Sequence, residues 1–172
     1  SFALVMKAAV KLGRRRFLRL AVQPSICVMQ DISFSEAEMR DVATIVDRAS
    51  FTSEFRQTLE QFRQAKDFGS LIVPKVSRPQ GICQAVRMKD FSSDILLRDL
   101  QERVLMVLKM SEALSQRYHV VVTNPPYLGA RAFGDLHKGW FAENYEKGRS
   151  DYFAAFILRG WSLALRSGYS AM

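Results

Sequence analysis

The stretch VVVTNPPY at residues 120–127 constrains the fold more than any other, because it joins a β-branched run directly to two prolines. Residues 118–123 (YHVVVT) form a continuous apolar run, typical of a strand buried on both faces of a parallel sheet. Pro125 and Pro126 have no amide hydrogen and a fixed φ, so they leave only carbonyl acceptors on a stiff, extended backbone. The stretch therefore predicts a parallel strand whose carboxyl end opens into a ligand crevice.

Helical and strand-like patterns alternate along the remaining sequence. They predict helices over residues 2–13, about 36–48, 51–62, 93–117, 135–146 and 151–166, and strands over 25–32, 118–123 and from residue 168 onward. Residues 69–92 contain two glycines and two prolines and are predicted to form a loop or irregular insertion. Strands alternating with helices predict an α/β fold with a mainly parallel sheet.

Polar residues near the predicted helix starts fit known capping patterns. Ser33 with Glu36 and Ser35 with Glu38 both match the capping box, in which a hydroxyl and a carboxylate satisfy orphan amides. Asp151 is predicted to cap the helix that follows it.

Apolar residues share one face of the last predicted helix and are predicted to pack in the core: Phe153, Phe156, Ile157, Trp161 and Leu165. Phe153 and Phe156 are accordingly interpreted as core rather than site residues. His119, at a strand start, is interpreted as a packed or exposed histidine rather than a catalytic base.

Composition limits the class of protein further. At 172 residues and 48% hydrophobic, the chain can bury one sizeable core and is too short for two ordinary domains. No window approaches the roughly 18 apolar residues of a membrane span, and no signal-peptide pattern opens the sequence, so we predict a cytoplasmic setting. Cys27 and Cys83 are far apart, and with only two histidines no metal-ligand spacing can be written, so no metal is expected.

The formal net charge of +8 is concentrated near the start of the sequence. Residues 1–30 contain no acidic side chain and six basic ones, which are Lys7, Lys11, Arg14, Arg15, Arg16 and Arg19. Clustered cations of this kind favour a polyanionic partner, and Arg14, Arg15 and Arg16 are the candidate contacts to nucleic-acid phosphates. The alternative is a solvated basic face with no partner.

The residues after the predicted strand at 118–123 are suited to holding an amino group. Asn124 adds a side-chain carbonyl next to the proline carbonyls, and two fixed acceptors can take both hydrogens of one amino group. This arrangement draws the nitrogen lone pair out of conjugation and stabilises the positive charge that develops as the nitrogen attacks an electrophile. Tyr127 offers a flat face on which a planar base can stack.

These residues resemble a known family. NPPY after HVVVT is similar to the catalytic motif of class I S-adenosylmethionine-dependent amino methyltransferases that modify adenine in DNA. The wider context, YHVVVTNPPYLGAR followed by ENYEKGRSDYFAAFILRGWSLALRSGYSAM, resembles the large adenine-specific methyltransferases of BREX-type phage-defence systems. FALVMKAA, ICVMQDI and AKDFGSLI (residues 65–72) also resemble that family.

The resemblance implies a role for each residue of the motif. Asn124 and Pro125 would accept the hydrogen bonds of the target amino group, Tyr127 would stack on an adenine flipped out of the duplex, and Pro126 would hold the turn. Asn124 would also contribute to the cofactor site. The implied cofactor is S-adenosylmethionine and the implied partner is double-stranded DNA, with other phage-defence components as further candidates.

The sequence departs from the family in its cofactor motifs. It contains no glycine-rich turn between a strand and a helix, and no acidic residue after a second strand, which such enzymes use to bind S-adenosylmethionine. If the family order applies, residues 26–32 correspond to the third strand, 118–123 to the fourth and 168–172 to the fifth. The chain, residues 1–172, is therefore interpreted as an internal fragment of a Rossmann-like catalytic domain, with a helical insertion over about 33–117 and the NPPY strand, helices and next strand over 118–172. Alone it is expected to be inactive.

Two other functions are also compatible with the sequence. An amino methyltransferase acting on protein glutamine or RNA guanine uses similar Asn-Pro-Pro chemistry, because an amide nitrogen also needs its lone pair localised. Alternatively, the chain is a non-catalytic DNA-binding remnant whose affinity comes from residues 7–19.

Overall fold

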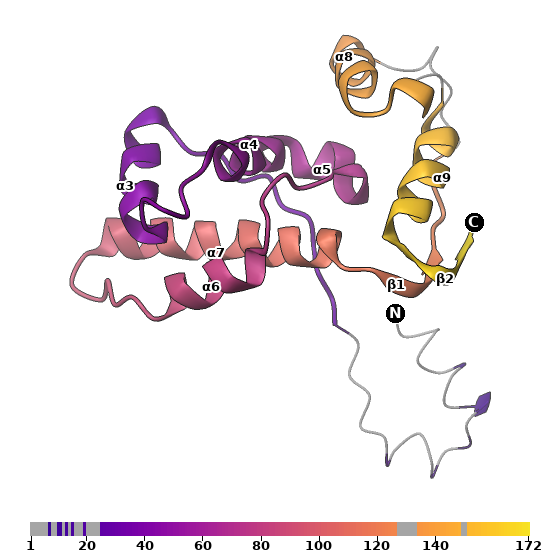
Figure 1. Cartoon of the computed structure of the whole chain (residues 1–172), viewed down its shortest axis with the longest axis horizontal. Helices are drawn as coiled ribbons and strands as arrows, with labels where there is room; N and C mark the ends of the chain where they lie inside the picture. The colour runs from indigo at the N-terminus through magenta and orange to yellow at the C-terminus, as the bar shows by residue number, and fades with distance from the viewer. Residues whose placement is uncertain are drawn as a thin grey trace.

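A computed structural model describes residues 7, 10, 11, 13, 15, 19, 25–126, 134–148 and 151–172 (Figure 1). Its described helices are α3 (Glu36–Val46), α4 (Ser53–Gln61), α5 (Ala65–Phe68), α6 (Pro79–Arg87), α7 (Ile95–Ser115), α8 (Asp135–Asn144) and α9 (Tyr152–Leu163), with short 3₁₀ turns at Phe62–Gln64, Gly69–Leu71 and Glu146–Gly148. The strands are β1 (Tyr118–Val122) and β2 (Ala164–Ala171). This mixed α/β structure confirms the predicted fold class. Among the described helices, none is long and apolar enough to cross a membrane.

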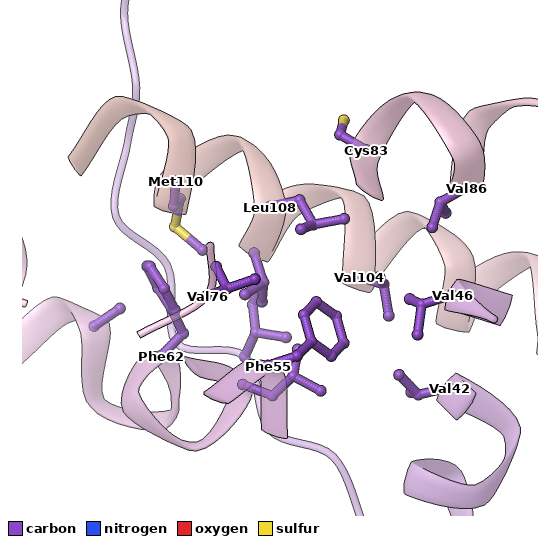
Figure 2. Packing of buried hydrophobic residues seen from close by; sticks show 14 of the residues in the cluster. Val42, Val46, Phe55, Phe62, Val76, Cys83, Val86, Val104, Leu108 and Met110 are labelled. Carbon is purple, nitrogen blue, oxygen red and sulfur yellow. The ribbon is translucent and has the colours of Figure 1, made fainter. Parts of the chain in front are cut away.

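The long helix α7 is the central helix of residues 36–115, which contain α3 to α7 and are called here the helical part. α3, α4 and α6 pack against it, with α4 and α6 on different sides (Figure 1). Phe55 and Phe62 lie between their own segment and α7, facing Leu108 and Met110 (Figure 2). Burying aromatic side chains of this size contributes on the order of 2–3 kcal/mol each, so this cluster is the main apolar core of the described residues.

The start of α3 confirms one of the two predicted capping boxes. The Ser35 hydroxyl accepts from the Glu38 amide at 3.3 Å, and the Glu38 carboxylate accepts from the Ser35 amide at 2.7 Å. Ser33 is not the cap, because the helix begins at Glu36 and Ser35 is its N-cap residue. The Ser33 carbonyl accepts a hydrogen bond from Arg103 at 3.0 Å.

Helix α6 lies inside the stretch predicted to be a loop, so that prediction is wrong for Pro79–Arg87. Pro79 begins the helix, where its fixed φ suits helical geometry and its missing amide has no partner to lose. Gly81 has a low helix propensity, and it obscured the helical spacing of the apolar residues in this stretch. Burial of Cys83 and Val86 against α7 stabilises the helix despite this low propensity.

The two strands run parallel, as predicted for a mainly parallel sheet, with Val120, Val121 and Val122 of β1 beside Tyr169, Ser170 and Ala171 of β2. The prediction that β1 is buried on both faces is wrong: Val121 is buried, whereas Val120 and Val122 are 59% and 72% exposed. The reason is that the described sheet has two strands, and α9 covers only the face that carries Val121.

Residues 25–32 do not form the predicted strand. Their side chains alternate in the expected way, with Cys27 and Met29 packed against the helical core and Ile26 and Val28 exposed. A strand also needs a hydrogen-bonded neighbour, and no described strand lies beside this segment. The backbone is instead held by single contacts, such as the 3.0 Å bond from the Ile32 amide to the Phe62 carbonyl.

The packed face of α9 differs in part from the predicted one. Phe156 is partly buried and packs against the cluster that contains Phe141 and Tyr152, as predicted, whereas Leu165 lies in β2 and not in the helix. Phe153, Ile157 and Trp161 are exposed, Trp161 by 75%. The buried face instead carries the small residues Ala155 and Gly160 together with Tyr152, Arg159 and Leu163. Small residues are needed here because α9 approaches β2 closely: a Cβ on Gly160 would lie 2.5 Å from the Ser170 hydroxyl.

Candidate functional site

The Asn-Pro-Pro sequence lies where the parallel ladder ends. The Thr123 amide donates a 3.0 Å hydrogen bond to the Ala171 carbonyl, one residue beyond β1. Asn124 follows and is exposed, Pro125 is buried, and Pro126 is exposed. Tyr127, the predicted stacking residue, lies outside the described residues.

The chemistry of this turn is that of a hydrogen-bond acceptor. Asn124 presents its side chain to solvent next to a residue pair with no amide hydrogen, so the local backbone offers oxygen atoms and no donor from Pro125 or Pro126. Burial of the Pro125 ring keeps this backbone fixed against the body of the protein. An exposed amide oxygen beside a fixed carbonyl can hold an amino group from outside.

The helix that follows the motif packs against the helical part. Trp140 of α8 stacks on Phe68, with ring centroids 3.9 Å apart and planes 9° from parallel. The Tyr145 hydroxyl donates a 2.5 Å hydrogen bond to the Leu71 carbonyl, and burial raises the pKa of Tyr145 to about 12. The motif is therefore followed in sequence by a helix that is attached to residues 68–71.

Arg159 is a buried cation that the sequence analysis missed. It is 4% exposed and donates to the carbonyls of Ser70, Ile72 and Leu114 at 2.7, 2.8 and 2.7 Å. Burial lowers the pKa of its guanidinium from the ordinary value. The available signal was its spacing, because Tyr152, Ala155 and Arg159 lie on one face of α9.

The basic run is only partly described. Arg15 is exposed, as are Lys7, Lys11 and Arg19, whereas Arg14 and Arg16 lie outside the described residues. Gly13 has φ 76°, a left-handed conformation that suits the predicted helix end at this residue.

Two further sequence predictions are confirmed. His119 is exposed. Asp151 caps α9, because its carboxylate accepts a 2.9 Å hydrogen bond from the Phe153 amide.

The described residues contain no glycine-rich turn of the type that holds S-adenosylmethionine. Such a site needs amides from a glycine-rich turn after a strand. In the described part of the chain the glycines with positive φ are Gly13 and Gly69, and neither follows a strand. β1 leads instead into two prolines. The described residues also contain no cluster of three or more metal-ligating side chains.

Comparison with known proteins identifies the family. The Eco57I restriction-modification methylase family matches residues 7–172, so the chain belongs to this family. The adenine-specific methyltransferase BrxX of Escherichia coli O9:H4 (strain HS) is 31% identical over 119 residues, which cover 67% of this chain and 10% of BrxX. The adenine-specific methyltransferase PglX of Lacticaseibacillus casei (strain Zhang) is 26% identical over 180 aligned residues, which cover 99% of this chain and 14% of PglX.

These matches confirm the resemblance to the BREX-type adenine methyltransferases. The chain spans only 10% and 14% of the length of the two relatives.

Proposed function

We propose that this chain carries the target-base part of an enzyme that methylates the exocyclic amino group of adenine in double-stranded DNA. The observation that carries the proposal is the exposed Asn124 next to the buried Pro125, directly after the parallel ladder. Membership of a methylase family and similarity to two adenine-specific methyltransferases support adenine as the target.

In this proposal the chain binds and polarises the amino group. The Asn124 side-chain carbonyl and the Pro125 main-chain carbonyl accept its two hydrogens, which pulls the nitrogen lone pair out of conjugation with the ring. Positive charge then develops on the nitrogen between two fixed dipoles, which favours the transition state over the ground state. Tyr127 stacks on the flipped adenine, and Pro126 holds the turn.

S-adenosylmethionine is the proposed methyl donor, supplying an electrophilic methyl group when bound. Asn124 is proposed to touch its reacting end, and the remaining groups that bind it are assigned to residues outside the described ones. Double-stranded DNA is the proposed macromolecular partner, with contacts from Arg14, Arg15 and Arg16 to its phosphates, and other phage-defence components are further proposed partners.

The proposal is tested with the full-length protein in which this chain occurs. It is incubated with methyl-labelled S-adenosylmethionine and, in separate reactions, duplex DNA, a protein with a methyl-accepting glutamine, and structured RNA. We expect label in DNA alone, recovered as N6-methyladenine after digestion and mass spectrometry. Label in protein or RNA would support the alternative amino methyltransferases, and DNA binding without label would support a non-catalytic remnant.

A further inference from the structure

Residues 68–72, called here the 68–72 turn, receive side chains from three later parts of the sequence. Trp140 stacks on Phe68, the Tyr145 hydroxyl bonds to the Leu71 carbonyl, and Arg159 bonds to the carbonyls on either side of Leu71. All three partners follow the Asn-Pro-Pro motif in sequence, so this turn connects the helical part to the segment that carries the proposed site.

Arg159 makes the most demanding of these contacts. Besides the three carbonyls, it donates to the Ser162 hydroxyl at 3.0 Å. Within the described ranges no carboxylate lies at ion-pair distance from it, so its charge is compensated by carbonyl dipoles. Hydrogen bonds from a buried guanidinium to several carbonyls depend on its planar fork, which a lysine ammonium cannot reproduce.

The hydrogen bond from Arg159 to the Leu114 carbonyl caps the carboxyl end of α7. The last carbonyls of a helix have no partner within it, and the negative end of the helix dipole favours a cation. Arg159 satisfies the Leu114 carbonyl at 2.7 Å, and the Tyr118 hydroxyl satisfies the Ala113 carbonyl at 2.7 Å. The end of α7 is therefore capped by side chains from α9 and β1.

The start of β1 is fixed to the same elements. Helix α7 ends at Ser115 and β1 begins at Tyr118, so only two residues separate them. Arg117, one of these two, donates to the Ala164 carbonyl at 3.2 Å. An extended strand cannot lengthen, so the position of the α7 end determines where β1 ends and where Asn124 lies.

We propose that Arg159 is a positioning residue for the Asn124 and Pro125 acceptors: by joining α9 to the end of α7 and to the 68–72 turn, it sets the position of β1 along its own axis. The inference rests on the proposed function of those acceptors. Under this inference the helices α3 to α7 help to set the geometry of the proposed site.

The test compares Arg159→Leu and Arg159→Lys in the full-length protein, at a temperature where both are folded by circular dichroism. Misplacing a reacting group by about 1 Å can cost about 100-fold in rate, so we expect kcat for DNA methylation to fall by about 10- to 100-fold in Arg159→Leu. The KM for DNA should stay within about threefold, because phosphate contacts are untouched. Arg159→Lys should recover part of kcat.

Arg103→Leu is the matched control. Arg103 is a half-buried arginine, bonded to Glu38, Asp99 and the Ser33 carbonyl, but its partners lie within residues 33–103 and not at β1. We expect its kcat to stay near that of the wild type when the folded fractions are matched. An equal loss of kcat in Arg103→Leu, or an unchanged kcat in Arg159→Leu, would overturn the positioning role.

Amide hydrogen exchange separates this inference from the proposed function. Exchange of the amides of residues 118–124 should accelerate in Arg159→Leu and not in Arg103→Leu, whether or not the protein methylates DNA. If exchange follows this pattern but Asn124→Ala retains full activity, the proposed role of the acceptors fails and the mechanical coupling stands. Unchanged exchange of the amides of residues 118–124 in Arg159→Leu would refute the coupling itself.

Discussion

The amide of Thr123 is hydrogen-bonded to the carbonyl of Ala171 at 3.0 Å, which extends the parallel ladder one residue past β1. Asn124 is thus the first residue beyond the ladder, and its backbone position is fixed by the sheet on one side and by buried Pro125 on the other. Under the proposed function, a backbone held in this way reduces the reorganisation needed when an amino group arrives, which favours stabilisation of the developing charge.

Gly168 is required by the pairing of the two strands. A Cβ at this position would lie 2.8 Å from the His119 carbonyl oxygen and 3.0 Å from that of Tyr118. Both are backbone atoms of β1, so the strands must separate. We expect Gly168→Ala to lower the free energy of unfolding by about 1–3 kcal/mol.

Gly139→Ala is the control for this prediction. Gly139 lies in the interior of α8, and a Cβ at this position would have nothing within 4 Å, so alanine should stabilise the helix by about 0.5–1 kcal/mol. Urea titration followed by tryptophan fluorescence measures both variants. Equal stability of Gly168→Ala and wild type would contradict the observed strand register.

Glu38 should make stability depend on acid pH. Its hydrogen bond from Arg103, together with that from the Ser35 amide, lowers the pKa of Glu38 from 4.5 to about 2. A carboxyl whose pKa is lower in the folded state stabilises the protein above its unfolded pKa, and this contribution is lost as pH falls from about 4.5 to about 2. The free energy of unfolding measured across this range should fall less steeply in Glu38→Gln than in wild type.

Arg103→Met provides a second measurement of the same network, because it removes the leading cause of the lowered pKa. Its pH dependence should resemble that of Glu38→Gln. If both variants keep the wild-type slope, the Glu38 carboxylate does not titrate in this range.

The sequence predicted local features well because their causes are local. The Ser35 and Glu38 capping box and the Asp151 cap each depend on a few neighbouring residues, and the structure contains both. The position of the turn after residues 118–123 was also predictable from local sequence, because two adjacent prolines end a strand whatever its neighbours in the fold are.

Features that depend on distant partners were not predictable. Phe153 and Trp161 were predicted to be core because they are apolar, yet α9 turns its small residues and Arg159 inward, since it must approach β2 and reach the 68–72 turn. Residues 25–32 have the composition of a strand, but strand formation also requires a neighbour. The helical spacing of Arg159 was the available signal of its burial, and the sequence could not identify its three carbonyl partners because they lie 45 to 89 residues away.

The run Arg14, Arg15 and Arg16 is predicted to contact phosphates. Changing all three to glutamine should weaken binding to every duplex sequence alike and reduce the slope of log K against log salt by about 0.9 for each phosphate that the arginines neutralise. Fluorescence anisotropy at several salt concentrations measures the slope. Arg98→Gln, at an exposed residue already paired with Glu102 at 3.5 Å, is the control. An unchanged slope in the triple variant would indicate a solvated basic face.

The 172-residue chain alone is predicted not to bind S-adenosylmethionine appreciably. The reason is that the described residues place no glycine-rich turn after a strand and that Asn124 alone would touch only the reacting end of the cofactor. Isothermal titration of the chain with S-adenosylmethionine is the measurement. Micromolar binding would mean that a cofactor site exists within these residues.

The most direct test of the central claim is the rate of methyl transfer to duplex DNA by the full-length protein carrying Asn124→Ala. Removing one preorganised hydrogen-bonding group from such a site costs about 100- to 1,000-fold in kcat, so we predict a decrease of this size with DNA affinity nearly unchanged. Asn144→Ala, at an exposed asparagine of α8, should keep wild-type turnover. Wild-type turnover in Asn124→Ala would contradict the assignment of this residue to the target amino group.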